Sequence, residues 1–332
     1  FGATALGATA SVYEGAPDYP GPGRVWEIAE RHKLKALGLS PTLVRALRAS
    51  VDPAASGAGV DLSTLRVFGS TGEPWNPVPF RWLFDTVGKG QRPIVNYTGG
   101  TEISGGILMS NPLHPIKAAS FSAPCPGMEV DVIDDSGNSL VGEVGELAVR
   151  TPWIGMTRGF WRDKDDERYH QAYWAKVPNT WVHGDWARRD EDGQWWILGR
   201  SDDTVNVGGK RVGPAEFESV LVAHESVVEA AAVGVPHPLK GSEVICFCML
   251  IDGAEPSDDL ADELAQRCGE FLGRPLRPGR VHFVPDLPRT RNAKVMRRIV
   301  RTAYLSEDPG DTSSLVNPES IDAIREAITS QG

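Results

Sequence analysis

The sequence predicts an α/β protein of two domains, residues 1–199 and residues 200–332, with a small β-subdomain inside the first. Three observations predict this architecture. Short apolar strands alternate with helical segments up to residue 102, which is typical of a largely parallel sheet. From residue 120, apolar and polar residues alternate around turns, as in antiparallel hairpins. A polar, glycine-rich joint follows, and beyond it helices and strands alternate as in a small α+β domain.

Periodicity and end signals place the elements of the first domain. The first ten residues are apolar and rich in Gly and Ala, which predicts the interior of a buried α/β element. Apolar residues recur near helical spacing over residues 24–37. Ser40 and Pro41 form an N-cap and first-turn pair for a helix that ends at Ala49. The remaining predictions are strand 65–68, helix 77–87, strand 93–96, a hairpin pairing 128–133 with 145–150, and a second hairpin turning at 190–193.

The second domain is predicted from the same signals. Pro214 opens an amphipathic helix, and two apolar strands follow it. The predicted elements are helix 214–223, strands 228–235 and 244–251, helix 260–272, strand 281–284 and a basic last helix from Ala293.

The composition argues against several classes of protein. A net charge of −10 disfavours duplex nucleic acid or an anionic membrane as the main partner. No apolar run approaches the ~20 residues that span a bilayer, and no secretory signal is visible. The four cysteines form no C-x-x-C pair, and Cys246 and Cys248 lie in one apolar strand, so we expect buried free thiols. These features together predict a cytoplasmic protein, with a homo-oligomer left open.

Two loops follow predicted strands of the sheet. Residues 69–74 (GSTGEP) and 97–102 (YTGGTE) are rich in Gly, Thr and Glu. Ligands of parallel sheets bind beyond the carboxyl ends of the strands, where both loops fall. Backbone N–H groups and Thr hydroxyls can bind phosphate, and Glu102 can hold Mg²⁺ through oxygen. Taken alone, a Thr-Glu pair is more often part of an ordinary turn.

The joint at residues 199–211 (GRSDDTVNVGGKR) suits neither a core strand nor a regular helix. It combines Arg and Lys with Asp around three glycines. Arginine clamps phosphate through its planar set of donors, and glycine allows close backbone approach. The composition therefore indicates a polar joint that binds anions. A charged surface hairpin that turns at Gly208 and Gly209 explains it equally well.

Two further residues suit a nucleotide site. Asp185 lies between strands, where its carboxylate can accept hydrogen bonds from ribose hydroxyls or simply form a turn. Lys294 is placed at the N-terminal end of the predicted last helix, where a cation is disfavoured unless an anion meets it. A lysine on a mobile loop suits a carboxylate–phosphate centre, where negative charge builds during bond formation. The alternative is a plain basic helix or a nucleic-acid patch, and the overall acidity disfavours the latter.

Five blocks, in this order along the chain, carry a family resemblance: 69–74, the loop ending at 100–102, 183–185, 199–211 and 288–298. Together they resemble the adenylate-forming acyl-CoA synthetases of the AMP-binding superfamily, and most closely the acetyl-CoA synthetase-like branch. The resemblance implies part of a large α/β domain followed by a small, mobile C-terminal domain. It also implies ATP, Mg²⁺ and CoA as cofactor and cosubstrates, and a small-molecule carboxylic acid as substrate.

The resemblance assigns roles residue by residue. Lys294 matches the lysine that promotes acyl-adenylate formation, Asp202 the hinge of the small domain, and Glu102 the Mg²⁺ ligand. The acyl pocket is assigned to Thr71 and Gly99, and CoA binding to Gly208 and Gly209. The nucleotide-binding residues are Gly72, Glu73, Pro74, Asn96, Tyr97, Thr98, Gly100, Thr101, Asp185, Arg200 and Arg211.

The family joins a carboxylate to AMP, releasing pyrophosphate, and then transfers the acyl group to the CoA thiol. The lysine is needed near the phosphate in the first step and must leave in the second, which explains why a glycine-rich joint connects the small domain to the large one. A nearer alternative is an adenylating enzyme that loads a carrier protein, although the match at Asp202 and Gly209 favours CoA. A non-catalytic nucleotide-binding remnant is the alternative from another class. A dehydrogenase is disfavoured because no G-x-G-x-x-G opens a helix after a strand.

The chain departs from the family pattern in four respects. Thr98 falls where the family stacks an aromatic side chain on adenine, with Tyr97 one place earlier. Gly99 replaces the tryptophan that closes the acyl pocket of acetate-specific members, so we expect an acid larger than acetate. Residues 292–293 (NA) replace Ser-Gly before the lysine, which stiffens that loop. The family's Ser/Thr/Gly-rich phosphate loop is absent, so we expect a C-terminal portion that leaves apolar surface exposed near its start and adenylates weakly or not at all by itself.

Overall fold

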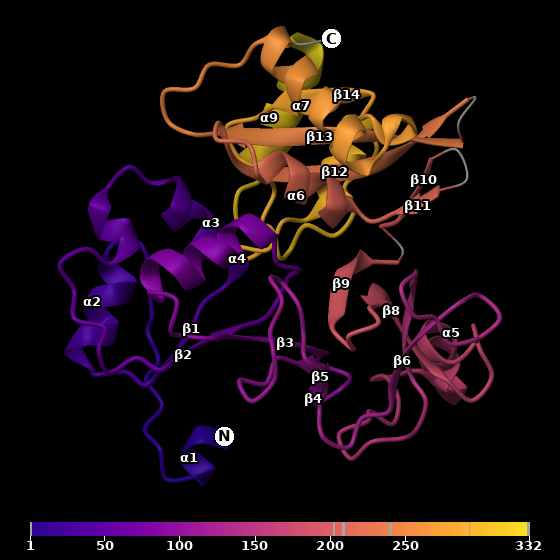
Figure 1. The fold of residues 1–332 in the computed structure, drawn as a ribbon. Coiled ribbons are helices and arrows are strands. Elements are labelled where there is room, and N and C mark those ends of the chain that lie inside the picture. Colours follow the sequence, from indigo (N-terminus) through magenta and orange to yellow (C-terminus); the bar gives the residue numbers. More distant parts are fainter. Residues whose placement is uncertain (1, 202, 208–209, 239–240, 292, 331–332) are drawn as a thin grey trace.

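A computed structural model of the chain describes residues 2–201, 203–207, 210–238, 241–291 and 293–330 (Figure 1). The first two hundred residues form a five-stranded and a four-stranded sheet, and the later residues form a third sheet flanked by helices. In Figure 1 this third part lies over helices α3 and α4 of the first. The arrangement confirms the predicted fold class, a portion of a large α/β domain with a β-subdomain and a small α+β domain.

The first sheet is parallel only in part. Strands β1, β2 and β3 pair in parallel, whereas β3–β4 and β4–β5 are antiparallel. A short turn joins β3 to β4, and so short a connection permits only an antiparallel partner. The largely parallel sheet predicted from sequence therefore holds for the first three strands. Their bounds are β1 (Ala36–Gly38), β2 (Val67–Ser70), β3 (Ile94–Gly100), β4 (Gly105–Met109) and β5 (Ala123–Pro124).

Three helices accompany this sheet. The Ser40 hydroxyl accepts a hydrogen bond from the Leu43 N–H at 3.2 Å, as expected for the N-cap of α3. The predicted helix 24–37 is shorter than expected, because Lys33 adopts a positive φ of 48° and turns the chain toward β1. The helices are α2 (Arg24–Arg31), α3 (Pro41–Ala49) and α4 (Pro77–Trp82), which continues as a π-helical turn over Leu83–Val87, with a short 3-10 turn at Pro53–Ser56.

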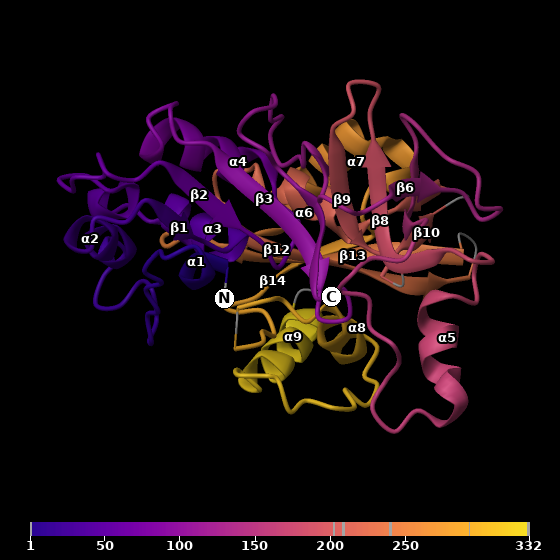
Figure 2. The same cartoon turned by 90° about the horizontal axis from the view of Figure 1, so that it is seen from below.

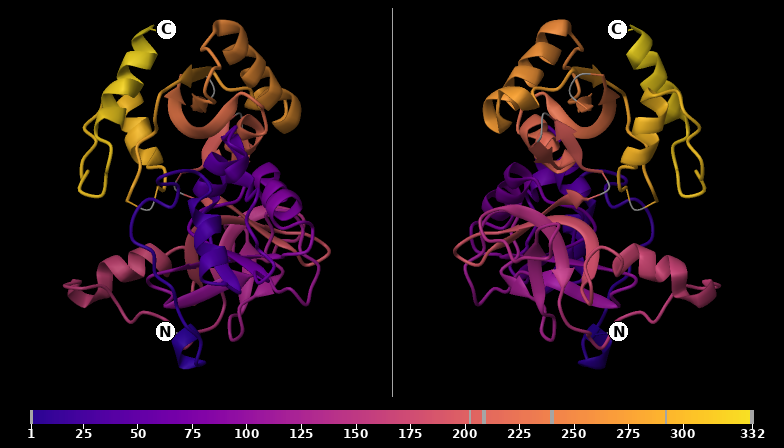
Figure 3. Two further views of the ribbon diagram at one scale, coloured as in Figure 1. Left: turned by 90° about the vertical axis from the view of Figure 1, so that its left-hand side faces the viewer. Right: turned by 90° about the vertical axis from the view of Figure 1, so that its right-hand side faces the viewer.

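The β-subdomain consists of the two predicted hairpins. Strand β6 pairs with β7, and β8 pairs with β9, all antiparallel, and β7 also pairs with β8. Beyond β7 the chain makes an excursion whose helix α5 projects sideways from the body (Figure 3). The bounds are β6 (Val130–Ile133), β7 (Val144–Val149), α5 (Glu167–Tyr173), β8 (Trp181–Arg189) and β9 (Trp195–Arg200), with a 3-10 turn at Lys164–Asp166.

The third sheet has a separate apolar core on each face. Along β13, Cys246 and Cys248 pack into the core beneath α6 and α7, whereas Ile245 and Phe247 pack into the core beneath α8 and α9. This is the alternation expected of a strand buried on both sides. The sheet orders its strands β11-β10-β13-β12, with β14 beside β13. Its strands are β10 (Val205–Val207), β11 (Lys210–Val212), β12 (Val227–His237), β13 (Gly241–Leu250) and β14 (Arg280–Phe283).

The helices of this small domain match the sequence predictions except at the end of the chain. The predicted last helix from Ala293 begins only at Arg297, and a further helix follows it. Ala293 has a φ of 60°, and Arg289 bridges Val295, so residues 289–295 form a tight loop rather than a first helical turn. The helices are α6 (Pro214–Val222), α7 (Asp258–Leu272), α8 (Arg297–Tyr304) and α9 (Glu319–Ser330), with a 3-10 turn at Arg274–Leu276.

The start of the chain contradicts one prediction and bears out another. Helix α1 (Gly2–Ala5) contains no buried residue, so the buried element predicted for the first ten residues is wrong. Leu6 and Val12 are 89% and 94% exposed, as expected for apolar surface left uncovered near the start. Figure 2 shows α1 and its N-terminus from below. Within the described chain these residues join none of the hydrophobic cores, and the core of the first sheet begins at Val25.

All four cysteines are unpaired and buried, as predicted from their spacing. Burial raises the pKa of Cys246 and Cys248, so these thiols are protonated at neutral pH. In the described part of the chain no helix is long and apolar enough to cross a bilayer.

His282 predicts a pH dependence of stability. Its ring is 3% exposed on β14, stacks on Phe247 at 5.3 Å, and neither nitrogen has a hydrogen-bond partner among the described residues. Burial, with the nearby Arg280 charge, lowers the pKa of His282. As pH falls below about 6.5 the unfolded chain therefore takes up a proton before the folded chain does, and stability falls.

Replacing His282 with leucine is expected to reduce this acid-dependent loss of stability, because leucine takes up no proton in either state. The check is the free energy of unfolding in urea at about pH 7.5 and about pH 5.5. His114→Leu, at an exposed histidine, is the matched control and should leave the pH dependence unchanged. An equal pH dependence in His282→Leu and the parent would contradict the prediction.

Candidate functional site

A cavity of about 190 Å³ lies where three parts of the chain meet. One wall comes from the loop that follows β2 and from the end of β3 with the turn after it, a second from β8 and β9, and the third from the loop that precedes α8. Residues 97–100, predicted as part of a loop, extend β3 instead, because they pair with β4. It is lined by Thr71, Gly72, Glu73, Pro74, Tyr97, Thr98, Gly99, Glu102, Phe121, His183, Asp185, Ile197, Gly199, Arg200, Lys294, Val295 and Arg297. Residues far apart in the sequence thus form one polar cavity with an apolar side.

Backbone geometry shapes the first wall. Gly72 has a φ of 104°, which a residue with a side chain rarely adopts, and it turns the chain away from β2. At Gly99, β3 and β4 approach so closely that an added Cβ would lie 2.1 Å from the carbonyl oxygen of Gly105. The space expected beside Gly99, from the absence of a tryptophan there, is therefore filled by the backbone of β4. This corrects the view that glycine at 99 by itself enlarges the pocket.

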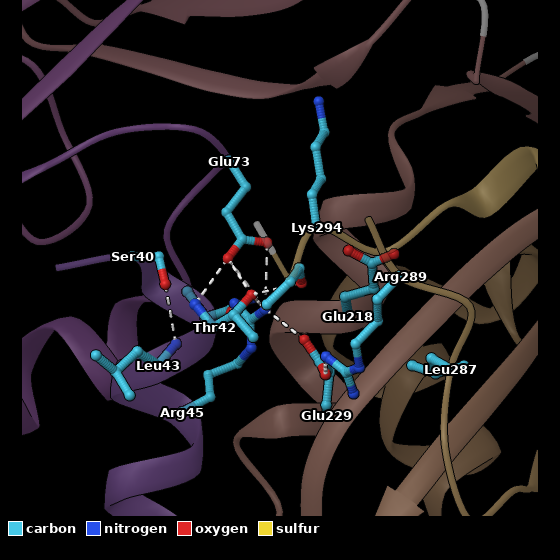
Figure 4. Close-up of polar contacts among 12 residues, drawn as sticks. Ser40, Thr42, Leu43, Arg45, Glu73, Glu218, Glu229, Leu287, Arg289 and Lys294 are labelled. Carbon is cyan, nitrogen blue, oxygen red and sulfur yellow. Dashed lines mark hydrogen bonds and ion pairs between the residues drawn. The ribbon is translucent and has the colours of Figure 1, made fainter. Parts of the chain in front are cut away.

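Glu73 is held rigidly at the edge of the cavity. Its carboxylate accepts a hydrogen bond from the Thr42 N–H at 2.7 Å and one from the Thr42 hydroxyl. The same carboxylate pairs with the Arg45 guanidinium at 3.2 Å (Figure 4). Because both partners belong to α3, the loop after β2 is fastened to that helix.

A second charged group lies on β8 and β9. The Arg200 guanidinium is 3.4 Å from the Asp185 carboxylate, and His183 Nε2 is 3.6 Å from it. Gly184 has a φ of 81°, and a Cβ there would lie 3.0 Å from Arg200 Nη2, so glycine lets the arginine cross the strand. Burial lowers the pKa of His183, although the Asp185 and Glu102 charges oppose this, so the ring is neutral at neutral pH.

Glu102 is the carboxylate predicted to bind Mg²⁺, and it faces the cavity. Its charge, together with the larger effect of burial, raises the pKa of the Tyr173 hydroxyl. No group of three or more His, Cys, Asp or Glu side chains able to hold a metal occurs in the part of the chain that the structure describes. Mg²⁺ commonly uses one or two protein carboxylates together with substrate phosphates, so a single ligand such as Glu102 fits such an ion.

Lys294 reaches the cavity from the small domain. The Thr290 N–H donates to the Lys294 carbonyl at 3.0 Å, and Val295 bridges Arg289, so the lysine lies at the tip of a short closed loop. The side chain is exposed and extends past Glu73 (Figure 4). A cation on one domain thus faces the strand-end loops of the other.

Comparison with known proteins identifies the chain's relatives. The pattern of the AMP-binding enzyme family matches residues 1–161, and that of the AMP-binding enzyme C-terminal domain matches residues 216–294. The chain belongs to the AMP-binding superfamily. Within it, the similarity is to the acetyl-CoA synthetase-like branch.

Two curated relatives of this AMP-binding chain are acetyl-coenzyme A synthetases. That of Methanothrix thermoacetophila is 39% identical over 98% of this chain and 49% of the relative. That of Rubrobacter xylanophilus is 42% identical over 99% of this chain and 51% of the relative. The chain therefore spans about half the length of the curated relatives it matches.

Solved structures of the superfamily share the fold. Acetoacetyl-CoA synthetase from Streptomyces lividans superposes with a TM-score of 0.82 at 29% identity, over 96% of this chain and 49% of that one. The anthranilate CoA ligase AuaEII in complex with anthranoyl-AMP gives a TM-score of 0.77 at 28% identity, over 90% of this chain and 55% of that one.

The structure of this AMP-binding chain gathers most of the predicted site residues into the cavity. Asn96, Gly100 and Thr101 lie next to it without lining it, and Asn96 instead accepts a hydrogen bond from the Tyr97 N–H at 3.1 Å. Asp202, Gly208 and Gly209 lie outside the described residues, as does the side chain of Arg211. Strand β10 pairs antiparallel with β11, as a hairpin requires. Val205, Val207 and Val212 are buried in the core of the small domain, so this part of the chain is not the surface hairpin that was the alternative.

Sequence reasoning missed several residues that line the cavity. They are Phe121, His183, Ile197, Val295 and Arg297. Val295 is the direct neighbour of Lys294, and His183 lies two residues before Asp185, so nearness in sequence was an available signal. Phe121 and Ile197 carry no such signal, because an apolar residue on a strand looks the same whether it faces a core or a ligand.

Proposed function

We propose that the complete protein is an AMP-forming carboxylate–CoA ligase, which converts an acid, ATP and CoA to acyl-CoA, AMP and diphosphate through an acyl-adenylate. The observation that carries this proposal is the meeting of Lys294 with the two strand-end loops and with Asp185 in one cavity. Membership of the AMP-binding superfamily supports it.

Each part of the cavity suits one part of the reaction. The loop at residues 71–74 and the side chains of Tyr97 and Thr98 suit an adenine, and Asp185 with Arg200 suits the ribose. Lys294 would meet the negative charge that builds on the α-phosphate as the carboxylate attacks. Nucleotide-binding roles for Asn96, Gly100, Thr101 and Arg211, and CoA-binding roles for Gly208 and Gly209, are proposals that rest on the resemblance.

Magnesium is proposed at Glu102. When bound, Mg²⁺ would neutralise phosphate charge, and the chain's own contribution is one carboxylate oriented toward the cavity. The boundary between domains is proposed at residues 199 and 200, with Asp202 as the hinge. The position of β9, which ends at Arg200 before β10 begins at Val205, supports this division.

We propose further that the acid is larger than acetate. The support is that side chains of Tyr97, Phe121 and Ile197 line one side of the cavity. Similarity to an acetoacetyl-CoA synthetase structure supports a larger acid, whereas the names of the curated relatives favour acetate. Measuring activity with a panel of acids distinguishes acetate from a larger acid as the substrate.

The test is acid-dependent exchange of pyrophosphate into ATP by the complete gene product, with the present chain assayed beside it. We expect exchange with the complete protein, and a higher kcat/KM for acetoacetate, branched, medium-chain or aromatic acids than for acetate. Acyl-CoA should form when CoA is added. Absence of exchange with every acid would contradict the ligase proposal. Exchange without acyl-CoA formation would favour an enzyme that loads a carrier protein. A preference for acetate would contradict only the proposal that the acid is larger than acetate.

A further inference from the structure

Four charged side chains, each no more than 15% exposed, form a row across the contact between the two domains. Glu73 pairs with Arg45 at 3.2 Å, Arg45 pairs with Glu229 at 2.6 Å, and Glu229 pairs with Arg289 (Figure 4). Their charges alternate in sign along the row. Arg45 and Glu73 belong to the first domain, and Glu229 and Arg289 to the small domain, so the Arg45–Glu229 pair joins the two.

The row is largely withdrawn from water. The side chain of Glu229 is 4% exposed, that of Arg45 7% and that of Glu73 12%. Burial would lower the pKa of Arg45, but the Glu73 and Glu229 carboxylates raise it, so the guanidinium stays charged. A buried charge that loses its partner is strongly destabilising. Glu229 and Arg45 therefore favour the arrangement of domains in which they meet.

Both ends of the row lead to the cavity. Glu73 lies in the loop that lines it, and Arg289 begins the short loop whose tip carries Lys294. The same helix that carries Arg45 also touches this loop, because the Thr42 hydroxyl lies 3.5 Å from the Ala293 carbonyl. The position of Lys294 thus depends on α3 through two separate contacts.

Neighbouring contacts support the same arrangement. Arg45 also donates to the Asn76 side chain at 3.1 Å, and Asn76 in turn donates to Ser219 of the small domain at 3.0 Å. Arg48, one turn further along α3, donates to the Val222 carbonyl at 3.3 Å. The domains meet along α3 through polar groups, which can separate and re-form more readily than an apolar core.

We propose that Arg45 and Glu229 are positioning residues that hold the small domain where Lys294 enters the cavity, and that Glu73 links this arrangement to the nucleotide loop. The proposal rests on the proposed function. In this proposal Arg45 does not contact the substrate. Arg45 acts through Glu73, Glu229 and the loop that carries Lys294. Its loss should impair the step that needs Lys294 and spare the step that does not.

The first test separates the two half-reactions in the complete gene product. Arg45→Met and Glu229→Gln should each lower pyrophosphate exchange roughly 100-fold, the size expected when a reacting group is misplaced by about 1 Å. Acyl-CoA formation from a synthetic acyl-adenylate and CoA should change by less than about threefold. Arg45→Lys keeps the charge but reaches fewer oxygens, and should restore part of the exchange.

The matched control is Arg150→Met, which removes a partly buried pair with Asp131 that lies within the first domain. It should leave the ratio of the two half-reactions unchanged. Equal losses in both half-reactions for Glu229→Gln would overturn the proposal, because a merely structural role lowers both.

A second readout does not depend on activity. Spin labels at Ala46→Cys and Glu225→Cys, both exposed, report the distance between domains, and the four native cysteines are buried. We expect one narrow distance distribution in the parent, and a second, longer population in Glu229→Gln. Identical distributions, or a broad one in the parent, would overturn the proposal. If the exchange assay shows no activity but the distance shift occurs as expected, the ligase proposal is contradicted and the positioning role of Arg45 and Glu229 is supported.

Discussion

Replacing Lys294 with alanine is expected to lower pyrophosphate exchange by the complete protein on the order of 100- to 1,000-fold. The lysine is a cation that the small domain brings to the cavity, on the loop that precedes α8. Without it, charge that builds at the α-phosphate loses a partner inside a partly enclosed cavity, where such an interaction is stronger than in water. The measurement is exchange at saturating ATP and acid.

Three comparisons sharpen this prediction. Lys294→Arg should retain part of the activity, because the charge is kept but its geometry changes. Lys164→Ala removes an exposed lysine near α5 and should have no effect. Acyl-CoA formation from a synthetic acyl-adenylate should survive in Lys294→Ala. Full exchange in Lys294→Ala would remove the lysine from the reaction and leave the cavity as a binding site only.

Adding a single methyl group at Gly99 is expected to destabilise the protein by roughly 3 kcal/mol. The Cβ of alanine would lie 2.1 Å from the Gly105 carbonyl oxygen, so β3 and β4 would have to separate at the mouth of the cavity. The measurement is the free energy of unfolding in urea. The same variant should lose affinity for the acid, since Gly99 lines the cavity beside Thr98.

Gly38→Ala is the matched control for this glycine. Gly38 is exposed on β1, and an added Cβ there meets nothing within 4 Å. Alanine should therefore change stability by less than about 1 kcal/mol, and a small gain is expected from the unfolded state. Equal changes in the free energy of unfolding at Gly38 and Gly99 would contradict the prediction, because β4 would then move aside at little cost to accommodate a side chain at position 99.

Local signals in the sequence determined most of the secondary structure. Ser40 and Pro41 marked the start of α3, and the hairpins around residues 134–138 and 190–193 formed as predicted. These signals act between residues near one another in the chain, which is why they can be read without a fold. The same holds for the ordered motifs, each a short run of neighbouring residues, which by themselves indicate the superfamily.

Departures occurred where distant parts of the chain override local preference. The apolar residues 1–10 suggested a buried element, but no core within the described chain receives them. Basic residues after Ala293 suggested a helix, but the bridge between Arg289 and Val295 delays it to Arg297. A glycine in place of tryptophan suggested open space, but the carbonyl of Gly105 fills it.

The sequence by itself determined the fold class, the superfamily and the residue types that can bind a nucleotide, because each is carried by short runs of neighbouring residues. Only the tertiary structure decided which side chains face one cavity and which charges meet across the domains. Arg45 and Glu229 are 184 positions apart and form no motif. Their pairing exists because α3 packs against β12, and burial makes two such charges dependent on each other.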